Sequence, residues 1–237
     1  MKLLKEASKE IGLEITEEMC NDFFQYKEML LEWNEKINLT SITEEREIIL
    51  KHFVDSVSVL TLEEFKIENL KIIDVGTGAG FPAIPIKIMR RDINMTLLDS
   101  LNKRLSFLNN VIENLNFSDI ECIHSRAEDL AKKTEYRETF DICVSRAVAN
   151  LSALTEYCLP YVKLGGSFIA FKGNNVTEET HDASNAISVL GGKITNIKKI
   201  KIPFTDISHT LVVITKICET PNIYPRKSNQ ITKKPIS

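Results

Sequence analysis

Ile72-Ile73-Asp74-Val75-Gly76-Thr77-Gly78-Ala79-Gly80-Phe81-Pro82 is the stretch that decides the fold of this chain. The apolar run 70–75 predicts a buried strand, and the apolar pattern over 83–91 predicts a helix directly after the glycine turn. A strand, a glycine turn and a helix together present backbone N–H groups to a nucleotide-like ligand. Glycine permits the positive φ of such a turn and lets a ligand approach the backbone closely. A tight turn with a purely structural role remains the alternative.

The spacing of the glycines separates two classes of nucleotide site. The dinucleotide fingerprint requires glycine at its first, third and sixth places. Those places hold Gly76, Gly78 and Phe81, so the bulky sixth residue argues against an NAD-dependent oxidoreductase. The pattern Asp-x-Gly-x-Gly-x-Gly instead resembles motif I of S-adenosylmethionine-dependent methyltransferases.

Composition places the chain among ordinary globular proteins. Its 237 residues suit one α/β domain with an extension, and its 43% hydrophobic and 27% charged content are typical values. No apolar run approaches the roughly 20 residues of a membrane span. Charged residues begin at Lys2, too early for a secretory signal. We therefore expect a cytoplasmic protein without a membrane partner.

The cysteines and histidines suggest neither disulfides nor a metal site. There are five cysteines and four histidines, widely dispersed and without a Cys-x-x-Cys pair. Zinc sites and disulfide frameworks show characteristic close spacings that this chain lacks. We expect no metal.

Charge is distributed unevenly along the chain. From Lys193 onward nine Lys or Arg residues face only Asp206 and Glu219, although the whole chain has a net charge of −3. A basic end on an acidic protein suggests a polyanionic partner. A solvated charged surface is the alternative.

The chain divides into a helical first part, an alternating middle part and a basic tail. Apolar residues at spacings of three and four, and Thr16 as an N-terminal cap, predict a helix up to about Ile37. A second amphipathic stretch runs from Glu44 to about Leu60. Strands are then expected at 70–75, 95–99, 119–124, 140–145, 166–172, 194–202 and 210–217, and helices at 83–91, 103–115, 151–163 and 176–190.

This alternation predicts an α/β protein with a mostly parallel sheet and an antiparallel ending. That is the seven-stranded, Rossmann-like fold of class I S-adenosylmethionine-dependent methyltransferases, here with an N-terminal helical extension. We expect the extension at 1–66, packed on the core, the methyltransferase domain at 67–220 and an irregular basic tail at 221–237.

Asp99 is the expected partner of a ribose. It ends the second predicted strand of the domain, 21 positions after Gly78. In nucleotide-binding βαβ units an acidic residue about 20 residues beyond the glycines accepts hydrogen bonds from the ribose hydroxyls. Capping of the helix that begins near Asn102 is the alternative.

Two further segments are expected at the same sheet edge. Ala127 and Glu128 follow the third of these strands, where an adenosine site needs a small residue and polar groups; a plain helix N-terminus is the alternative. Arg146 ends the fourth strand, where it could pair with a carboxylate or a phosphate. A surface arginine is the alternative there.

The methyl acceptor is suggested by what the sequence lacks. Methyltransferases of exocyclic amines typically carry an Asn/Asp-Pro-Pro-Tyr/Phe motif after the fourth strand, and this chain does not. Methyltransferases of pyrimidine C5 usually have their cysteine nucleophile after a proline, whereas Cys158 precedes Pro160. No His/Asp pair suggests a dedicated base for methylation of a hydroxyl group. Guanine N7 needs none of these devices because its lone pair carries no proton. Proximity and orientation can then supply about 7–11 kcal/mol of the barrier.

A series of motifs in one order resembles the bacterial ribosomal small subunit methyltransferase G family, formerly called glucose-inhibited division protein B. The resemblance extends from about Trp33 to Pro235. The motifs are Asn38-Leu39-Thr40-Ser41-Ile42, His52-x-x-Asp55-Ser56, Asp74 to Pro82, Arg126-Ala127-Glu128, Ser145-Arg146-Ala147-Val148-Ala149, Lys172-Gly173 and Tyr224-Pro225-Arg226-Lys227.

The resemblance implies methylation of N7 of one guanine, guanine-527 in rRNA numbering, in a loop of 16S rRNA near the decoding centre. It also implies that Gly76 and Phe81 line the cofactor pocket, that Ala127 and Glu128 flank the adenine, and that Arg146 completes the site. Together with the residues reasoned above, the expected S-adenosylmethionine site is Gly76, Gly78, Gly80, Phe81, Asp99, Ala127, Glu128 and Arg146.

The chain departs from the family pattern at two positions. Ala83 stands where the family often has glycine, and we expect little effect because the residue remains small. Asn229 stands nearest to a glycine of the basic tail, where we expect it to preserve a turn because asparagine tolerates left-handed conformations.

The expected partner is 16S rRNA or the small ribosomal subunit, bound by a monomer, with no DNA. The residues expected to contact RNA are Lys172, Arg226, Lys227, Lys233 and Lys234. No catalytic side chain is assigned. A nucleotide-cofactor oxidoreductase and a non-catalytic, cofactor-binding ribosome-assembly protein are the competing hypotheses.

Overall fold

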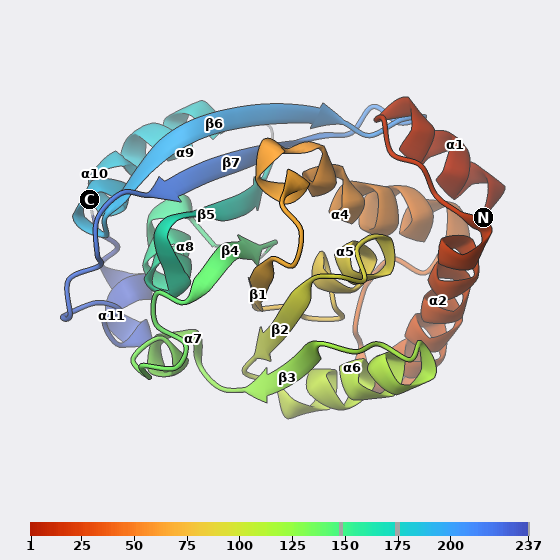
Figure 1. Cartoon of the computed structure of the whole chain (residues 1–237), viewed down its shortest axis with the longest axis horizontal. Helices are drawn as coiled ribbons and strands as arrows, with labels where there is room; N and C mark the ends of the chain where they lie inside the picture. The colour runs from red at the N-terminus through yellow and green to blue at the C-terminus, as the bar shows by residue number, and fades with distance from the viewer. Residues whose placement is uncertain (147–148, 174–175, 237) are drawn as a thin grey trace.

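The core of the protein is a seven-stranded sheet in the order β3-β2-β1-β4-β5-β7-β6 (Figure 1). The computed structural model describes residues 1–146, 149–173 and 176–236, so Ala147 and Val148 of the fourth-strand motif lie outside it. Neighbouring strands are parallel from β3 to β5, whereas β7 is antiparallel to both β5 and β6. The strands are β1 (Lys71–Val75), β2 (Asn94–Asp99), β3 (Ile120–His124), β4 (Phe140–Ser145), β5 (Val162–Lys172), β6 (Gly192–Lys201) and β7 (Ser208–Lys216).

Helices cover both faces of this sheet, which agrees with the alternation of strands and helices in the sequence. In Figure 1 the N-terminal helices lie at the right of the sheet and α8 to α11 at the left. The helices are α1 (Lys2–Glu10), α2 (Glu17–Ile37), α3 (Glu45–Glu47), α4 (Asp55–Val57), α5 (Ala83–Met89), α6 (Asn102–Asn114), α7 (Ala127–Leu130), α8 (Leu151–Cys158), α9 (Val176–Asp182), α10 (Ser184–Val189) and α11 (Ser228–Lys233).

Two hydrophobic cores lie on opposite faces of the sheet. Successive residues of β1 illustrate the alternation, because Ile72 packs into the core beneath α2, α5 and α6, and Ile73 packs into the core beneath α8 and α10. The first core also contains Phe23 and Phe53 of the N-terminal part, so that part and the sheet share one apolar interior.

The expected strands are all present, with ends shifted by a few residues. The expected helix 151–163 is shorter: α8 ends at Cys158 and a 3₁₀ turn, Leu159–Tyr161, follows around Pro160, which cannot donate a backbone hydrogen bond. The expected helix 176–190 is two helices, α9 and α10. The tail, expected to be irregular, contains α11, and Asn229 lies inside this helix rather than in a turn.

The N-terminal part is helical, as expected, but its second stretch is not one regular helix. Thr16 caps α2, its hydroxyl accepting a hydrogen bond from Met19 N at 3.2 Å. Between Glu45 and Thr61 the backbone passes from α3 through a π-helix, Ile48–Val54, and α4 into a 3₁₀ turn, Ser58–Thr61. In the parts of the chain that the structure describes, no helix is both long and apolar enough to span a bilayer.

The C-terminal tail is anchored to α8 by one ion pair. The Arg226 guanidinium donates through Nε and Nη2 to the carboxylate of Glu156, at 2.9 Å and 2.6 Å, and Arg226 N donates to it as well. The Glu156 side chain is fully buried, whereas that of Arg226 is 25% exposed. This bidentate contact with a buried carboxylate holds the start of the tail against α8.

We expect Arg226→Ala to lower the free energy of unfolding by about 3–5 kcal/mol, because it leaves a buried carboxylate without its cation. Lys227→Gln is the matched control, since Lys227 is the exposed neighbour and its replacement should change stability by less than about 0.5 kcal/mol. Urea denaturation of both variants measures the difference. Equal free energies of unfolding in the two variants would show that burial of the Glu156 carboxylate does not require the Arg226 guanidinium.

Candidate functional site

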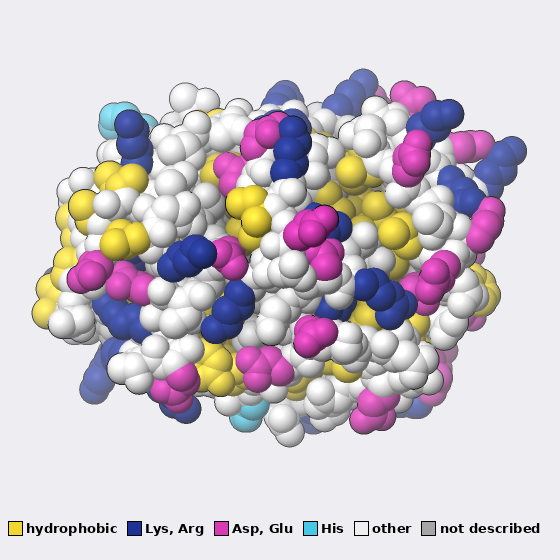
Figure 2. Space-filling view, viewed as in Figure 1, with side chains coloured by type: hydrophobic (Ala, Val, Ile, Leu, Met, Phe, Trp, Pro, Cys, Tyr) yellow, Lys and Arg dark blue, Asp and Glu magenta, His cyan; other side chains and the backbone are white. Residues whose placement is uncertain are grey.

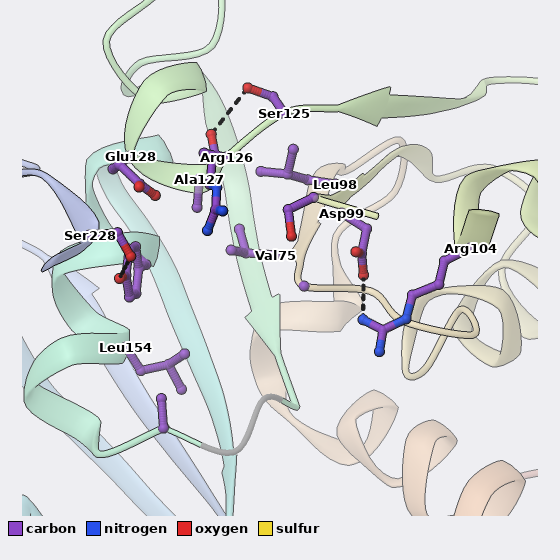
Figure 3. Close-up of a pocket in the computed structure, with 14 residues that line it drawn as sticks. Val75, Leu98, Asp99, Arg104, Ser125, Arg126, Ala127, Glu128, Leu154 and Ser228 are labelled. Carbon is purple, nitrogen blue, oxygen red and sulfur yellow. Dashed lines mark hydrogen bonds and ion pairs between the residues drawn. The ribbon is translucent and has the colours of Figure 1, made fainter. Parts of the chain in front are cut away.

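A cavity of about 240 Å³ opens at the carboxyl ends of β1, β2 and β3 (Figure 3). Ligands of open α/β sheets bind at this edge. Its wall combines the start of the glycine turn with α7, α8 and the tail. The lining residues are Val75, Gly76, Leu98, Asp99, Ser100, Arg104, Ser125, Arg126, Ala127, Glu128, Ala149, Leu154, Tyr157 and Ser228.

The glycine turn has a positive φ at Gly76, Gly78 and Gly80 (75°, 61° and 94°). A Cβ placed on Gly78 would meet only Gly76 O, at 4.0 Å, so the space above Gly78 is open. A Cβ on Gly80 would lie 2.5 Å from Ile84 Cγ1 and 2.8 Å from Leu108 Cδ2. Gly76 lines the cavity and the space above Gly78 is open, whereas Gly80 lets the turn pack against α5 and α6.

Asp99 lies beneath this turn with only 3% of its surface exposed. Its carboxylate accepts from Gly78 N at 3.0 Å, from Leu101 N at 2.9 Å and from Arg104 Nη1 at 3.2 Å, the last contact being drawn in Figure 3. The bond to Leu101 supports the entrance to α6, as in the capping interpretation. The position in the cavity lining also suits the ribose interpretation, so the two roles are compatible.

The rest of the cavity is a slot with apolar walls and a polar rim. Val75, Leu98 and Leu154 provide apolar surface, and Ala127 is the small residue expected there. Arg126 points its guanidinium into the opening in Figure 3. Such a slot suits a flat ring that carries polar groups at its edge.

Two lining residues come from places that the sequence did not single out. Tyr157 on α8 and Ser228 at the start of α11 are joined by a hydrogen bond between their hydroxyls, 2.8 Å long. The sequence patterns describe α8 only as an amphipathic helix and the tail only as basic. Neither pattern reveals that the tail returns to this cavity.

Asp74 is fully buried below the glycine turn. Its Oδ2 accepts from Ala83 N at 3.4 Å, while Oδ1 has no partner among the residues that the structure describes. Burial raises the pKa of Asp74 to about 7, although the nearby Thr77 hydroxyl, Ala83 N and the Arg146 charge favour the ionised form. The turn thus covers a buried carboxyl group that is partly protonated near neutral pH.

Phe81 and Arg146 lie beside the turn and do not line the cavity. The guanidinium carbon of Arg146 is 4.9 Å from the centre of the Phe81 ring, and the His52 ring stacks on Phe81 at 4.4 Å. Arg146 Nη1 donates to Asp55 Oδ2 at 2.9 Å, and Nη2 lies 3.2 Å from His52 Nδ1. Of the eight expected cofactor residues, Gly76, Asp99, Ala127 and Glu128 line the cavity, Gly78 is bonded to Asp99, Gly80 serves packing, and Phe81 and Arg146 form this adjacent cluster.

The fold brings together a His/Asp pair that the sequence did not suggest. His209 Nδ1 lies 2.6 Å from Asp55 Oδ1, and His209 Nε2 lies 3.3 Å from Ser58 Oγ. Ser58 is fully buried and donates to Asp55 O, so this serine cannot attack a substrate. Burial alone would raise the pKa of Asp55, but His209 and Arg146 outweigh it and hold that pKa below its usual value.

The expected RNA-contacting residues fall into two groups. Lys172 and Arg226 already have partners inside the protein: Lys172 Nζ contacts Glu179 Oε1 at 2.6 Å, and Arg226 holds Glu156. Lys227, Lys233 and Lys234 are exposed on the tail. Within the described residues, no group of three or more His, Cys, Asp or Glu could hold a metal ion.

Comparison with known proteins gives a consistent result. A family model described as rRNA small subunit methyltransferase G matches residues 19–209. A protein from Clostridium perfringens (strain SM101 / Type A) named Ribosomal RNA small subunit methyltransferase G is 54% identical over 234 residues, covering 99% of this chain and 98% of that protein. A protein of the same name from Acetivibrio thermocellus is 50% identical over 236 residues, covering 100% and 96%.

Solved structures show the same fold at low sequence identity. TYW2 from M. jannaschii in complex with AdoMet matches with a TM-score of 0.54 and 13% identity over 73% of this chain and 77% of that chain. A putative S-adenosyl-L-methionine-dependent methyltransferase from Methanococcus maripaludis matches with a TM-score of 0.54 and 14% identity, covering 81% and 93%. The predicted class I methyltransferase fold is confirmed.

Replacing the two glycines separates ligand contact from packing. We expect Gly78→Ala to lower the affinity for S-adenosylmethionine by more than about tenfold, because its methyl group enters the open space above the turn. The left-handed conformation should cost only about 1–2 kcal/mol of stability. Calorimetric titration and thermal unfolding measure both effects.

Gly80→Ala is the matched variant. Its Cβ would overlap Ile84 and Leu108, so we expect a larger loss of stability than in Gly78→Ala and a much smaller loss of affinity. The reverse ranking would show that Gly80, not Gly78, faces the ligand.

Proposed function

This chain belongs to the rRNA small subunit methyltransferase G family, and we propose that it transfers the methyl group of S-adenosylmethionine to N7 of one guanine in 16S rRNA. One observation carries the proposal beyond the family. The cavity places a buried carboxylate, Asp99, between an open glycine turn and an apolar slot, and this combination fits an adenosine. S-adenosylmethionine, the cofactor expected from the sequence, agrees with both the family and the fold.

The residues fit the parts of this cofactor one by one. The adenine would occupy the slot between Leu98, Ala127 and Leu154, and the ribose hydroxyls would donate to Asp99. The orphaned Oδ1 of Asp74 and the Arg146 cluster lie at the glycine turn, where the charged amino-acid end would follow. When bound, the cofactor supplies an electrophilic methyl group on a sulfonium.

Guanine N7 is a suitable methyl acceptor for this site because its methylation requires no general base. In this reaction the N7 lone pair would form the new bond to the methyl carbon, the sulfur–carbon bond would break with its electron pair left on sulfur, and no proton would have to be removed. The His209–Asp55 pair does not line the cavity and contacts Ser58 within the protein, so it is not placed to act as a base on a ligand there. Holding N7 in line with the methyl group can supply about 7–11 kcal/mol.

The choice of guanine-527 rests on the family resemblance, and the target guanine is expected in a loop, where extrusion costs less than from a duplex. An assay for 7-methylguanosine in 16S rRNA tests it. Chemical cleavage at 7-methylguanosine followed by primer extension should show the modification with the wild-type gene and lose it in a strain that lacks the gene. Complementation with the Gly78→Ala variant should fail to restore it. Unchanged modification in the deletion strain would favour the alternative, a non-catalytic ribosome-assembly protein.

We also propose that the tail binds rRNA phosphates through Lys227, Lys233 and Lys234. Figure 2 shows acidic and basic side chains interspersed over the face in view, without a broad basic surface on that face. The three lysines are exposed and lie on or next to α11: Lys227 directly precedes Ser228 at the cavity, and Lys233 and Lys234 lie at the other end of this short helix. This geometry would bring RNA to the rim of the cofactor cavity.

Replacing Lys227, Lys233 and Lys234 by glutamine should weaken RNA binding. The slope of log K for RNA binding against log salt concentration should become less steep by roughly 0.7–0.9 per lost phosphate contact. Affinity for S-adenosylmethionine should not change, because none of the three lines the cavity. The control replaces the exposed Lys9, Lys36 and Lys66, which gives the same change of net charge elsewhere. An equal loss in both triple variants would exclude a specific role of the tail.

A further inference from the structure

A continuous chain of polar contacts runs behind the glycine turn, from the N-terminal part to β7, and Arg146 stands at its centre. Thr40 Oγ1 lies 2.8 Å from His52 Nε2, and His52 Nδ1 lies 3.2 Å from Arg146 Nη2. Arg146 Nη1 donates to Asp55 Oδ2 at 2.9 Å, and Asp55 Oδ1 lies 2.6 Å from His209 Nδ1. Residues far apart in the sequence thus share one network.

The network fixes the protonation of His52. An arginine can only donate, so His52 Nδ1 must accept, and the ring proton must lie on Nε2, where it is donated to Thr40 Oγ1. Burial and the Arg146 charge lower the pKa of His52 to about 4, which keeps the ring neutral at physiological pH. His52 therefore serves Arg146 as a fixed acceptor.

The same contacts fix Arg146. Its guanidinium is held from two sides by Asp55 and His52, donates to Lys51 O at 3.3 Å, and lies against the Phe81 ring. The His52 ring stacks on the same phenylalanine. An arginine side chain otherwise has large rotational freedom, and prior ordering removes that cost from ligand binding.

We propose that His52 and Asp55 are positioning residues for Arg146, holding its guanidinium beside the glycine turn for the carboxylate end of the bound cofactor. This rests on the proposed function, in which Arg146 belongs to the S-adenosylmethionine site. A guanidinium held in place binds a carboxylate with defined direction as well as with charge. The motif His52-x-x-Asp55 lies at the end of the π-helix Ile48–Val54 and the start of α4. The proposal gives this motif a role in the site.

A purely structural role of this network would have different consequences when the network is broken. In that case the network would only attach the N-terminal part to the sheet, and its loss would lower stability without acting through Arg146. A double-mutant cycle separates the two, because residues that act through a common partner show non-additive effects. The cycle uses the full chain with His52→Ala, Asp55→Asn and Arg146→Ala, singly and with each of the first two combined with Arg146→Ala.

We expect each single variant to weaken S-adenosylmethionine binding by about tenfold or more, measured by calorimetric titration. In the Arg146→Ala background, the His52 and Asp55 substitutions should cause no further loss. The KM for S-adenosylmethionine should rise while kcat at saturating cofactor changes much less. His52→Asn should restore part of the affinity lost in His52→Ala, because its amide oxygen can replace Nδ1 as an acceptor.

Asp22→Asn is the matched control. Asp22 is a buried carboxylate of α2 that pairs with Arg91 at 2.7 Å, so it also attaches the N-terminal part to the core, but away from Arg146. It should lower the melting temperature and leave cofactor affinity unchanged. Thr40→Val removes the hydroxyl that accepts the Nε2 proton of His52 and a hydrogen bond from Ile42 N. It leaves the His52 ring in place, keeps the test available if His52→Ala does not fold, and should weaken binding in the same direction.

Additive losses of affinity in the cycle, or His52 and Asp55 variants that behave like Asp22→Asn, would overturn the proposal. That result is distinguishable from failure of the proposed function. If the wild-type protein methylates rRNA and the cycle is additive, only the positioning role fails. If the wild-type protein neither binds S-adenosylmethionine nor methylates rRNA, the proposed function fails.

Discussion

The hydrogen bond from Gly78 N to Asp99 Oδ2 is the contact on which the site depends. It joins the turn after β1 to the end of β2, and the same carboxylate supports the first residues before α6 through Leu101 N. A turn with three positive-φ glycines has little conformational preference of its own, so neighbouring groups must hold it. Asp99 holds it from below, and the buried Tyr26 of α2 holds it from the side by donating to Ala79 O at 2.5 Å.

The N-terminal part is therefore a component of the site and not an appendage. Tyr26 fixes the backbone of the glycine turn, and His52 packs against the phenylalanine that follows it. The departure from regular α-helix between Ile48 and Val54 lies directly at His52, and π-helical segments are frequent at functional positions because they redirect side chains. The shared hydrophobic core beneath α2, α5 and α6 makes these contacts rigid.

How much the sequence could predict follows from how local each signal is. The glycine turn and Asp99 belong to one strand-turn-helix-strand unit, so their spacing along the sequence alone predicted that they lie close together. The start of β5 was missed because Leu164-Gly165-Gly166 interrupts the apolar pattern, although the backbone already pairs from Val162. The Asp55–His209 pair could not be foreseen, since it depends on β7 returning beside β5.

The C-terminal tail shows why charge alone was a poor guide. Arg226 reads as an RNA-binding residue in a basic segment, yet it neutralises Glu156, whose burial within α8 no sequence pattern reveals. That ion pair, with the hydroxyl contact between Tyr157 and Ser228, makes the tail one wall of the cofactor cavity. If cofactor binding and RNA binding each order the tail, the two are thermodynamically linked, and such linkage is reciprocal. In the proposed function, order in α11 that favours cofactor binding would also present the tail lysines to a polyanion, which would couple the basic tail to the cofactor cavity.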